Sequence, residues 1–292
     1  MIYKNHANNL FNRRKFKKIT TANHFDHNDL FKLFCIYQKR KSSKINLIQH
    51  GNNYFTNIYS SYSSETTFAN YFHTWGKQGS LSNNYFNVKT FNHKPTFKLK
   101  RNNNILIIIE DIPHKCFLNN NYLNYLKNIN LISDFRDYLV SKKITFDFKI
   151  IDNPKTKYLF NKLNFNKLKK NRDFLDVIDD YDIILFNYYS TGFLECVSIN
   201  KPCLILTNEY QNTSTIQMNI PLNTNFENYI TYFKYNNIYN QNLSSVLDLF
   251  ANNTKKYLNL WKSKEIQIKL KQFSEDYSKY QSSKSLLKLF YE

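Results

Sequence analysis

The chain has 292 residues, of which 42% are hydrophobic, and a formal net charge of +19. This apolar content is sufficient for a globular core, but no apolar run has the length of a membrane-spanning helix, and residues 1–6 lack the apolar stretch of a secretory signal. The four cysteines include no C-x-x-C pair, and no G-x-G-x-x-G or P-loop motif occurs, which argues against a disulfide framework, a dinucleotide oxidoreductase and an NTPase. We therefore expect a cytoplasmic protein with free thiols.

The excess of positive charge has two explanations. The 41 Lys and Arg residues outnumber 22 acidic residues, which would attract nucleic acid, an anionic membrane face or a negatively charged substrate. Alternatively, base composition explains the charge, because Asn, Lys and Ile are abundant while only four glycines and five prolines occur. We favour the second explanation, since a solvated basic surface needs no partner.

The first 90 residues predict a small α/β domain. We expect strands at 19–22, 45–48 and 71–75, a helix from Leu30 to about Lys39, and a helical turn at 65–69. The helix should place Leu30, Phe31, Phe34 and Cys35 on one side. Residues 77–103 are polar and show no clear period, so they predict an interdomain linker.

Two histidines lie just before the predicted helix. His24 and His27 flank Asp26, but this spacing is a weak match to a metal site, and no further cluster of ligands is near. The Asp and Asn residues of this segment predict a helix N-cap instead. We therefore expect no metal.

From residue 104 onward, predicted strands and helices alternate. Strands are expected at 105–109, 144–151, 183–186 and from Cys203, and helices at 122–140, 174–178 and 193–199. This alternation predicts a parallel, doubly wound sheet. A further helix is expected at 226–233, and one or two long helices at 243–280. Their candidate packing positions are Val246, Leu249, Phe250, Leu258, Trp261, Ile268 and Phe273.

Two polar turns end predicted strands and are candidate binding sites. Ser190-Thr191-Gly192 joins strand 183–186 to a helix, an arrangement that presents backbone N–H groups to an anion, with Ser190 or Thr191 as the cap. Gln49-His50-Gly51-Asn52-Asn53 follows strand 45–48, at the strand end where α/β sheets bind ligands. Alternatively, His50 is a hydrogen-bonded loop histidine and the next residues form an ordinary turn.

An ordered set of short motifs runs through nearly the whole chain. They are Lys17–Asn23, Asn28–Lys32, Gln49–Tyr54, Phe72–Gly76, Tyr189–Glu195, Asn200–Pro202, Trp261–Gln267 and Phe273. In this order they resemble the bacterial surface-carbohydrate transferases found among capsule and lipopolysaccharide genes, which are distantly similar to CDP-glycerol glycerophosphotransferases and to GT-B glycosyltransferases. No single motif is specific, and the specificity comes from their order.

The resemblance implies a GT-B-like α/β fold with two Rossmann-like domains and C-terminal helices. We expect an incomplete acceptor-side domain at 1–90, a linker at 91–103, a donor-nucleotide domain at 104–245, and helices at 246–292 that pack across the domains. The chain would then begin inside the first domain of the family. Two positions depart from the family pattern: an Arg expected near the end of strand 146–151 is replaced by Asp152-Asn153-Pro154, and a second Trp expected after Gly76 is Lys77.

The resemblance also implies the acceptor side of a mechanism. His50 would act as the general base for an acceptor hydroxyl, because its imidazole titrates near neutrality. Gln49, Gly51, Asn52 and Asn53 would line the acceptor site or cleft. Neither a metal nor a cofactor is expected, since the nucleotide-activated donor is itself a substrate.

On the donor side, Ser190 and Thr191 with the N–H groups of Gly192 and Phe193 would stabilise the leaving diphosphate. Glu195 would either bind a donor hydroxyl or satisfy only its own helix. The predicted partners are therefore a nucleotide-activated donor and a saccharide or lipid-linked acceptor, with an anionic membrane surface as a further candidate.

The predicted function is transfer of a glycosyl or glycerophosphate-type group in surface polysaccharide or lipopolysaccharide biosynthesis, at the inner face of the cytoplasmic membrane. Two alternatives stay open. One is a catalytically impaired remnant or a non-catalytic partner of another transferase. The other is a basic nucleic-acid-binding protein, which we rank last because the sequence has no recognition motif for nucleic acid.

Overall fold

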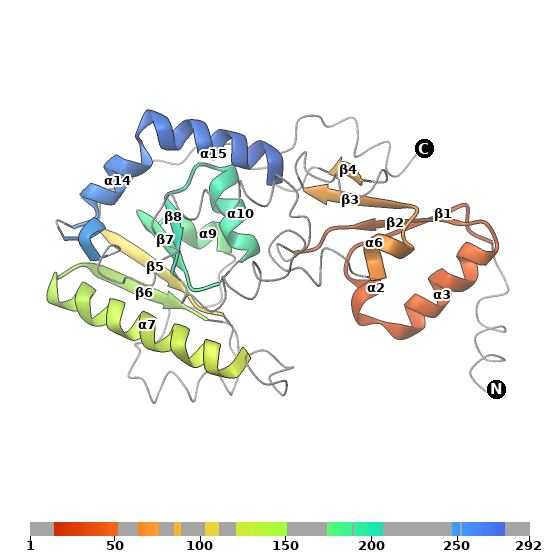
Figure 1. The fold of residues 1–292 in the computed structure, drawn as a ribbon, viewed down its shortest axis with the longest axis horizontal. Coiled ribbons are helices and arrows are strands. Elements are labelled where there is room, and N and C mark those ends of the chain that lie inside the picture. Colours follow the sequence, from red (N-terminus) through yellow and green to blue (C-terminus); the bar gives the residue numbers. More distant parts are fainter. Residues whose placement is uncertain are drawn as a thin grey trace, which may run out of the picture. The chain divides into compact units, whose positions relative to one another are not determined.

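The computed structural model describes residues 15–51, 64–75, 85–88, 103–110, 121–150, 174–188, 190–206, 247–251 and 253–277. The chain forms two compact units, one made of Met1–Asn92 with Glu275–Glu292 and the other of His93–Ser274 (Figure 1). Each unit contains a four-stranded parallel sheet with helices between its strands along the chain. The predicted α/β class is therefore confirmed.

The sheet of the first unit has the strand order β1-β2-β3-β4, and all neighbouring strands are parallel. Its elements are β1 (Lys18–Thr21), α2 (His24–His27), α3 (Asp29–Arg40), β2 (Lys44–Ile48), α6 (Ser64–Phe68), β3 (Tyr71–Trp75) and β4 (Tyr85–Val88). Ile45, Leu47 and Phe72 are buried in its core. Because the strands are parallel, their carboxyl ends meet at one edge of the sheet, where α/β proteins bind ligands.

Strand β4 shows that the prediction of a linker over residues 77–103 was wrong for four of these residues, whereas the linker at 91–103 stays a prediction. Tyr85–Val88 pair in parallel with Phe72–Trp75 of β3. Four residues are too few to show a period of two, although Tyr, Phe and Val all favour strands. Residues 76–84 and 89–102 lie outside the described part of the chain.

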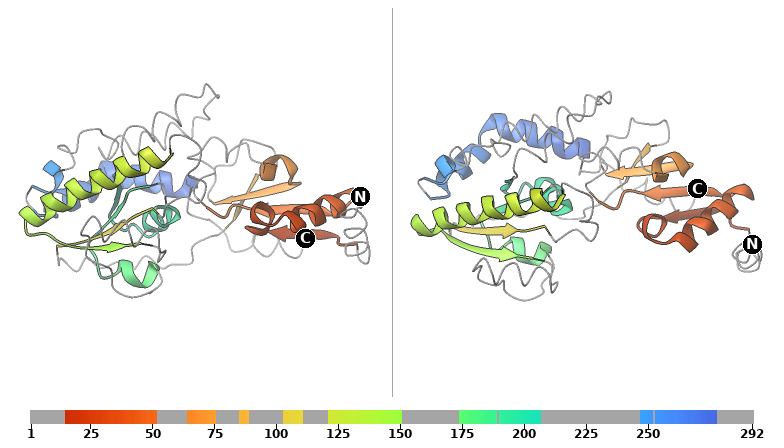
Figure 2. Two further views of the ribbon diagram at one scale, coloured as in Figure 1. Left: turned by 90° about the horizontal axis from the view of Figure 1, so that it is seen from below. Right: turned by 60° about the horizontal axis from the view of Figure 1, so that its bottom comes forward.

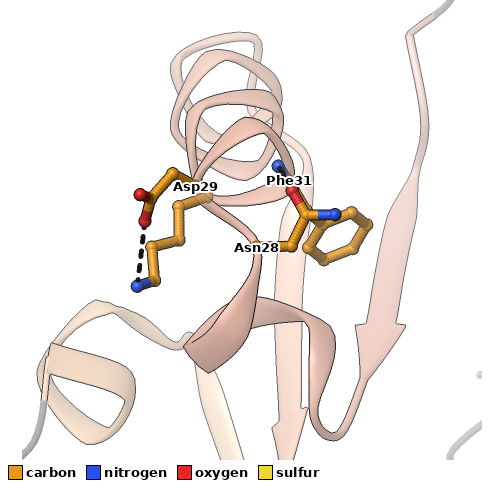
Figure 3. Close-up of polar contacts among 4 residues, drawn as sticks. Asn28, Asp29 and Phe31 are labelled. Atoms are coloured by element: carbon orange, nitrogen blue, oxygen red, sulfur yellow. Dashed lines mark hydrogen bonds and ion pairs between the residues drawn. The ribbon is translucent and has the colours of Figure 1, made fainter. Parts of the chain in front are cut away.

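Helix α3 begins at the cap that the sequence predicts. Asn28 has extended backbone angles, and its Oδ1 accepts a hydrogen bond of 3.0 Å from the backbone N–H of Phe31 (Figure 3). Asp29 occupies the first turn, where a negative charge complements the helix dipole. Its carboxylate also pairs with Lys32 one turn later, at 3.3 Å.

The buried face of α3 differs from the predicted one. Cys35 and Gln38 are buried, whereas Leu30 is 61% exposed. The prediction that Leu30 shares the buried side was therefore wrong. Apolar residues occur around much of this helix, so the sequence pattern alone does not define one face.

The sheet of the second unit has the strand order β6-β5-β7-β8, and it is also parallel throughout. Its strands are β5 (Asn104–Ile108), β6 (Thr145–Lys149), β7 (Ile183–Phe186) and β8 (Cys203–Ile205). Every side chain of the central strand β7 is buried, as its four apolar residues predict for a strand covered on both faces. After β5 the chain forms β6 on one side of it and then β7 on the other side. The place between β5 and β7, where the direction of the strand order reverses, is a topological switch point.

Helices cover both faces of this sheet. The helices are α7 (Asn121–Ser141), α9 (Phe174–Ile178), α10 (Thr191–Ser198), α14 (Lys255–Trp261) and α15 (Lys264–Tyr277). α7 and α9 lie on opposite faces (Figure 2). On α7, Ile129, Ile132, Phe135 and Leu139, which are spaced three or four residues apart, are buried. Phe135 packs edge-on against Phe250, with ring centroids 5.5 Å apart.

The C-terminal part of the chain forms two helices within the predicted range 243–280. α14 ends at Trp261 and α15 starts at Lys264. The predicted packing positions that are buried are Leu249, Phe250, Leu258, Trp261 and Phe273. Ile268 is 58% exposed, so its assignment was wrong, and α15 instead buries Ile266 and Leu270 together with Phe273. Val246 and the helix expected at 226–233 lie outside the described residues.

The described cysteines are free thiols. Cys35, Cys196 and Cys203 are all buried and unpaired by disulfides, as predicted, while Cys116 is not among the described residues. In the described ranges, no helix combines the length and the apolar character needed to cross a bilayer.

Candidate functional site

In the first unit, the turn after β2 is held in shape by Gln49. The Gln49 side chain is buried, and its Nε2 donates a hydrogen bond of 2.8 Å to the carbonyl of Gly51. Its backbone N–H donates to the carbonyl of His73 on β3, also at 2.8 Å. Gln49 therefore fixes the conformation in which His50 leaves the sheet. Asn52 and Asn53 lie outside the described residues.

His50 lies at the carboxyl edge of the first sheet, next to a buried carboxylate. The Nδ1 atom of His50 is 4.0 Å from Oε1 of Glu65, and the side chains are 21% and 4% exposed, respectively. The imidazole of His27 is also near, with ring centroids 6.0 Å apart and an edge-on geometry. They come from the turn after β2, the first turn of α6 and the end of α2. These segments follow strands of a parallel sheet, whose carboxyl ends share one edge.

Within the described residues, no group of three or more His, Cys, Asp or Glu side chains is placed to hold a metal ion. His24 is turned to another contact, an edge-on packing against Phe31 with centroids 5.8 Å apart. The Asp26 side chain is not among those described.

In the second unit, the turn after β7 forms a well-defined helix N-terminus. Ser190 is the N-cap of α10: it has extended backbone angles and its hydroxyl accepts a hydrogen bond of 3.0 Å from the N–H of Gly192. The N–H of Phe193 donates to the carbonyl of Ser190 at 3.1 Å. The predicted cap is thus confirmed, and the two N–H groups proposed for an anion already have acceptors within the turn.

Gly192 is closely packed against two aromatic rings. A Cβ atom at this position would lie 3.1 Å from Cε1 of Phe174 and 3.2 Å from Cε1 of Phe186, tighter than nine in ten real Cβ contacts, so that the rings would have to shift by a few tenths of an ångström. The glycine lets α10 approach the aromatic core beneath it. The motif therefore has a structural reason that is independent of any ligand.

Glu195 lies one turn further along α10 and is partly buried. Burial raises the pKa of its carboxyl group, and the positive charge of Lys149 partly opposes this rise. Lys149 is the last residue of β6, and its Nζ lies 5.7 Å from the centre of the Phe174 ring. A cation thus stands at the strand end where the expected Arg is replaced by Asp152-Asn153-Pro154, residues that are not themselves described.

Asn187 connects the two loops at the switch point of the second sheet. Its Oδ1 accepts a hydrogen bond of 2.7 Å from the backbone N–H of Glu110, the second residue beyond β5. The residue is fully buried, and its Nδ2 has no hydrogen-bond partner among the described residues. An unsatisfied buried amide costs about 1–3 kcal/mol, so a donor group is left available where ligands of such sheets bind.

Sequence reasoning missed Glu65, Asn187 and Lys149. None of them belongs to a recognisable motif, and each becomes part of a site only because the fold brings its element to the carboxyl edge of a sheet. The sequence also predicts that His50 on the acceptor side and the Ser190–Gly192 turn on the donor side act on one substrate pair, and these residues belong to different units. That joint action stays a prediction.

Comparison with known proteins identifies the family. No curated protein matches the chain. A family model described as LIC12162 family transferase matches residues 2–286, which confirms the predicted transferase class. Since this match covers nearly all 292 residues, the chain belongs to the LIC12162 family of transferases.

Proposed function

We propose that the chain transfers a glycosyl or glycerophosphate-type group from a nucleotide-activated donor to a hydroxyl of a saccharide or lipid-linked acceptor, in the synthesis of surface polysaccharide or lipopolysaccharide. The observation that supports this most is the switch point of the second sheet, where the buried Asn187 amide and the start of α10 follow the same strand. Doubly wound sheets bind nucleotides at this place. In the proposal, the two units form a GT-B-like pair, with the acceptor on the first and the donor on the second.

In the proposed reaction, His50 takes the proton of the acceptor hydroxyl. The hydroxyl oxygen forms a bond to the sugar carbon or the phosphorus atom of the donor. The bond from that atom to the nucleotide phosphate oxygen breaks, and its electron pair leaves with the nucleotide. The Ser190 and Thr191 hydroxyls and the positive end of the α10 dipole stabilise the negative charge that develops there.

The two charged side chains beside α10 fit this proposal. Lys149 would attract the donor phosphates in the place of the missing Arg. Glu195 would bind a donor hydroxyl, because a carboxylate in direct contact with the donor diphosphate would repel it. The net charge of +19 would further attract an anionic donor and the inner face of the cytoplasmic membrane.

Nucleotide binding tests the donor half. Thermal unfolding is followed with CMP, CDP, UMP and UDP, and with cytidine and uridine as controls that lack phosphate. A ligand at about 100 times its Kd stabilises by about 2.7 kcal/mol, so the melting temperature should rise by about 5 °C or more. Thr191→Val should reduce this rise, whereas Ser198→Ala, which removes a hydroxyl from the other end of the same helix, should not. If every nucleotide leaves the melting temperature unchanged, the donor site is refuted.

Loss of His50 tests the acceptor half in the cell. His50→Ala should abolish formation of the surface carbohydrate in a strain that depends on this gene. His24→Ala is the matched control, since this exposed imidazole belongs to the same unit but faces Phe31. Retained function in the His50→Ala strain would instead support a non-catalytic partner of another transferase.

A further inference from the structure

A buried carboxylate lies beside the proposed base. Glu65 is 3% exposed, although an ionised carboxylate is costly to remove from water unless it is paired. Its Oε1 lies 4.0 Å from Nδ1 of His50. This distance is an ion-pair contact and is longer than a hydrogen bond. Such contacts are often long in a ligand-free site and shorten when substrate binds.

The position of Glu65 follows from the topology. Glu65 is in the first turn of α6, and α6 connects β2 to the parallel strand β3. The first turn of a connecting helix lies at the carboxyl edge of a parallel sheet, where β2 delivers His50. The topology therefore brings both residues to the same edge of the sheet.

We propose that Glu65 is the positioning residue of His50: its carboxylate faces Nδ1, keeps the proton on that atom, and thereby makes Nε2 the atom that accepts the proton of the acceptor hydroxyl. This inference rests on the proposed role of His50. When Nε2 takes up the proton, the resulting imidazolium is stabilised by the negative charge of the Glu65 carboxylate close to Nδ1. No other bond changes in this step, and the acceptor oxygen keeps the electron pair of its former O–H bond.

Two other imidazoles of the first unit, those of His27 and His73, have to be considered when the pKa of His50 is interpreted. His27 of α2 packs edge-on against His50 at 6.0 Å, and its protonated form would oppose the effect of Glu65. His73 of β3 is held neutral, because burial and the charge of Lys18 lower its pKa to about 4. Comparing variants that differ only at Glu65 separates the carboxylate from both imidazoles.

The experiment reads His50 directly by NMR and needs no substrate. The chain is labelled with 15N and 13C in histidine, and the His50 signals are assigned by their loss in His50→Gln. Long-range 15N–1H correlations report which ring nitrogen carries the proton, and a pH titration reports the pKa of His50. The variants are Glu65→Gln and Glu65→Asp, with Glu265→Gln as a control that removes a 61%-exposed carboxylate from α15.

The wild-type imidazole should carry its proton on Nδ1. Glu65→Gln should lower the pKa of His50 by about one unit, a tenfold loss of proton affinity, while Glu65→Asp should retain part of that affinity and Glu265→Gln all of it. A neutral ring protonated mainly on Nε2, or an unchanged pKa in Glu65→Gln, would overturn the proposal. The tautomer is read in the wild-type chain, so this outcome holds even if a Glu65 variant fails to fold. Nucleotide binding does not enter the readout, which keeps a failure here distinct from a failure of the donor site.

Discussion

Replacing His73 by Gln should remove an acid-induced loss of stability from the first unit. His73 is 6% exposed in β3. Burial, with a contribution from the positive charge of Lys18, lowers its pKa from 6.5 to about 4. In the unfolded chain the imidazole keeps a pKa near 6.5. The unfolded state therefore binds the proton more readily, and acid favours unfolding.

The size of the effect follows from the shift. A fall in the pKa of His73 from 6.5 to about 4 corresponds to about 3 kcal/mol, at about 1.4 kcal/mol per unit. Because the folded pKa is lowered, this stability is fully present above pH 6.5. It is lost progressively as the pH falls from 6.5 towards 4, and no more is lost below the folded pKa. Carboxylates titrate in the same range, so the informative quantity is the difference between the wild type and His73→Gln.

Urea unfolding followed by Trp fluorescence provides the assay. The chain has two Trp residues, and a Trp261→Phe background leaves Trp75 of β3 as the reporter of the first unit. At about pH 7.5 the His73 imidazole is neutral in both the folded and the unfolded wild type, so the difference from His73→Gln at this pH gives the cost of the substitution itself. The wild type should lose about 2–3 kcal/mol relative to His73→Gln between about pH 7.5 and 4.5. A difference that stays constant over this range would refute the assignment of the shift to His73.

Two further predictions concern the local packing and capping of helices. Gly192→Ala should lower the free energy of unfolding by about 1–3 kcal/mol, because its methyl group would meet the rings of Phe174 and Phe186 at 3.1–3.2 Å; wild-type stability in urea would show that the rings can move aside. Asn28→Ala should cost about 1 kcal/mol, since this side chain caps α3. Asn23→Ala is its matched control, because Asn23 precedes α2 without a side-chain cap bond, and equal losses would contradict the capping argument.

The parts of the fold that were predicted correctly are those fixed by local sequence. Ile183–Phe186 form a buried strand because four consecutive apolar residues satisfy both faces of a central position. Ser190 caps α10 because its hydroxyl reaches an N–H only two residues away. By contrast, Leu30 and Ile268 are apolar but exposed, since the buried side of a helix depends on the elements packed against it and not on its own sequence alone.

The residues of the candidate site also fall into those that the sequence predicts and those that only the structure reveals. His50 could be found because it directly follows a strand, where the carboxyl edge of a parallel sheet is expected to bind ligands. Glu65 could not, because its distance to His50 depends on how α6 crosses between β2 and β3. Asn187 reads in the sequence as an ordinary loop residue. The strand order places it at the switch point, and the hydrogen bond that its Oδ1 accepts from the backbone N–H of Glu110 holds its amide there.

Ser190 allows the cap and the donor site to be separated experimentally. Its hydroxyl accepts from the N–H of Gly192, and a hydroxyl can still donate its own proton to a phosphate oxygen at the same time. Asp is as good an N-cap as Ser, but a carboxylate has no proton to donate and repels a phosphate. Ser190→Asp should therefore keep the cap of α10, with a loss in the free energy of unfolding of the ligand-free chain because Ser190 is only 7% exposed. It should abolish the stabilisation by nucleotides. A Ser190→Asp chain that is folded and still stabilised by nucleoside diphosphates would show that the diphosphate does not bind at the start of α10, and the donor would then have to be sought elsewhere along the carboxyl edge of this sheet.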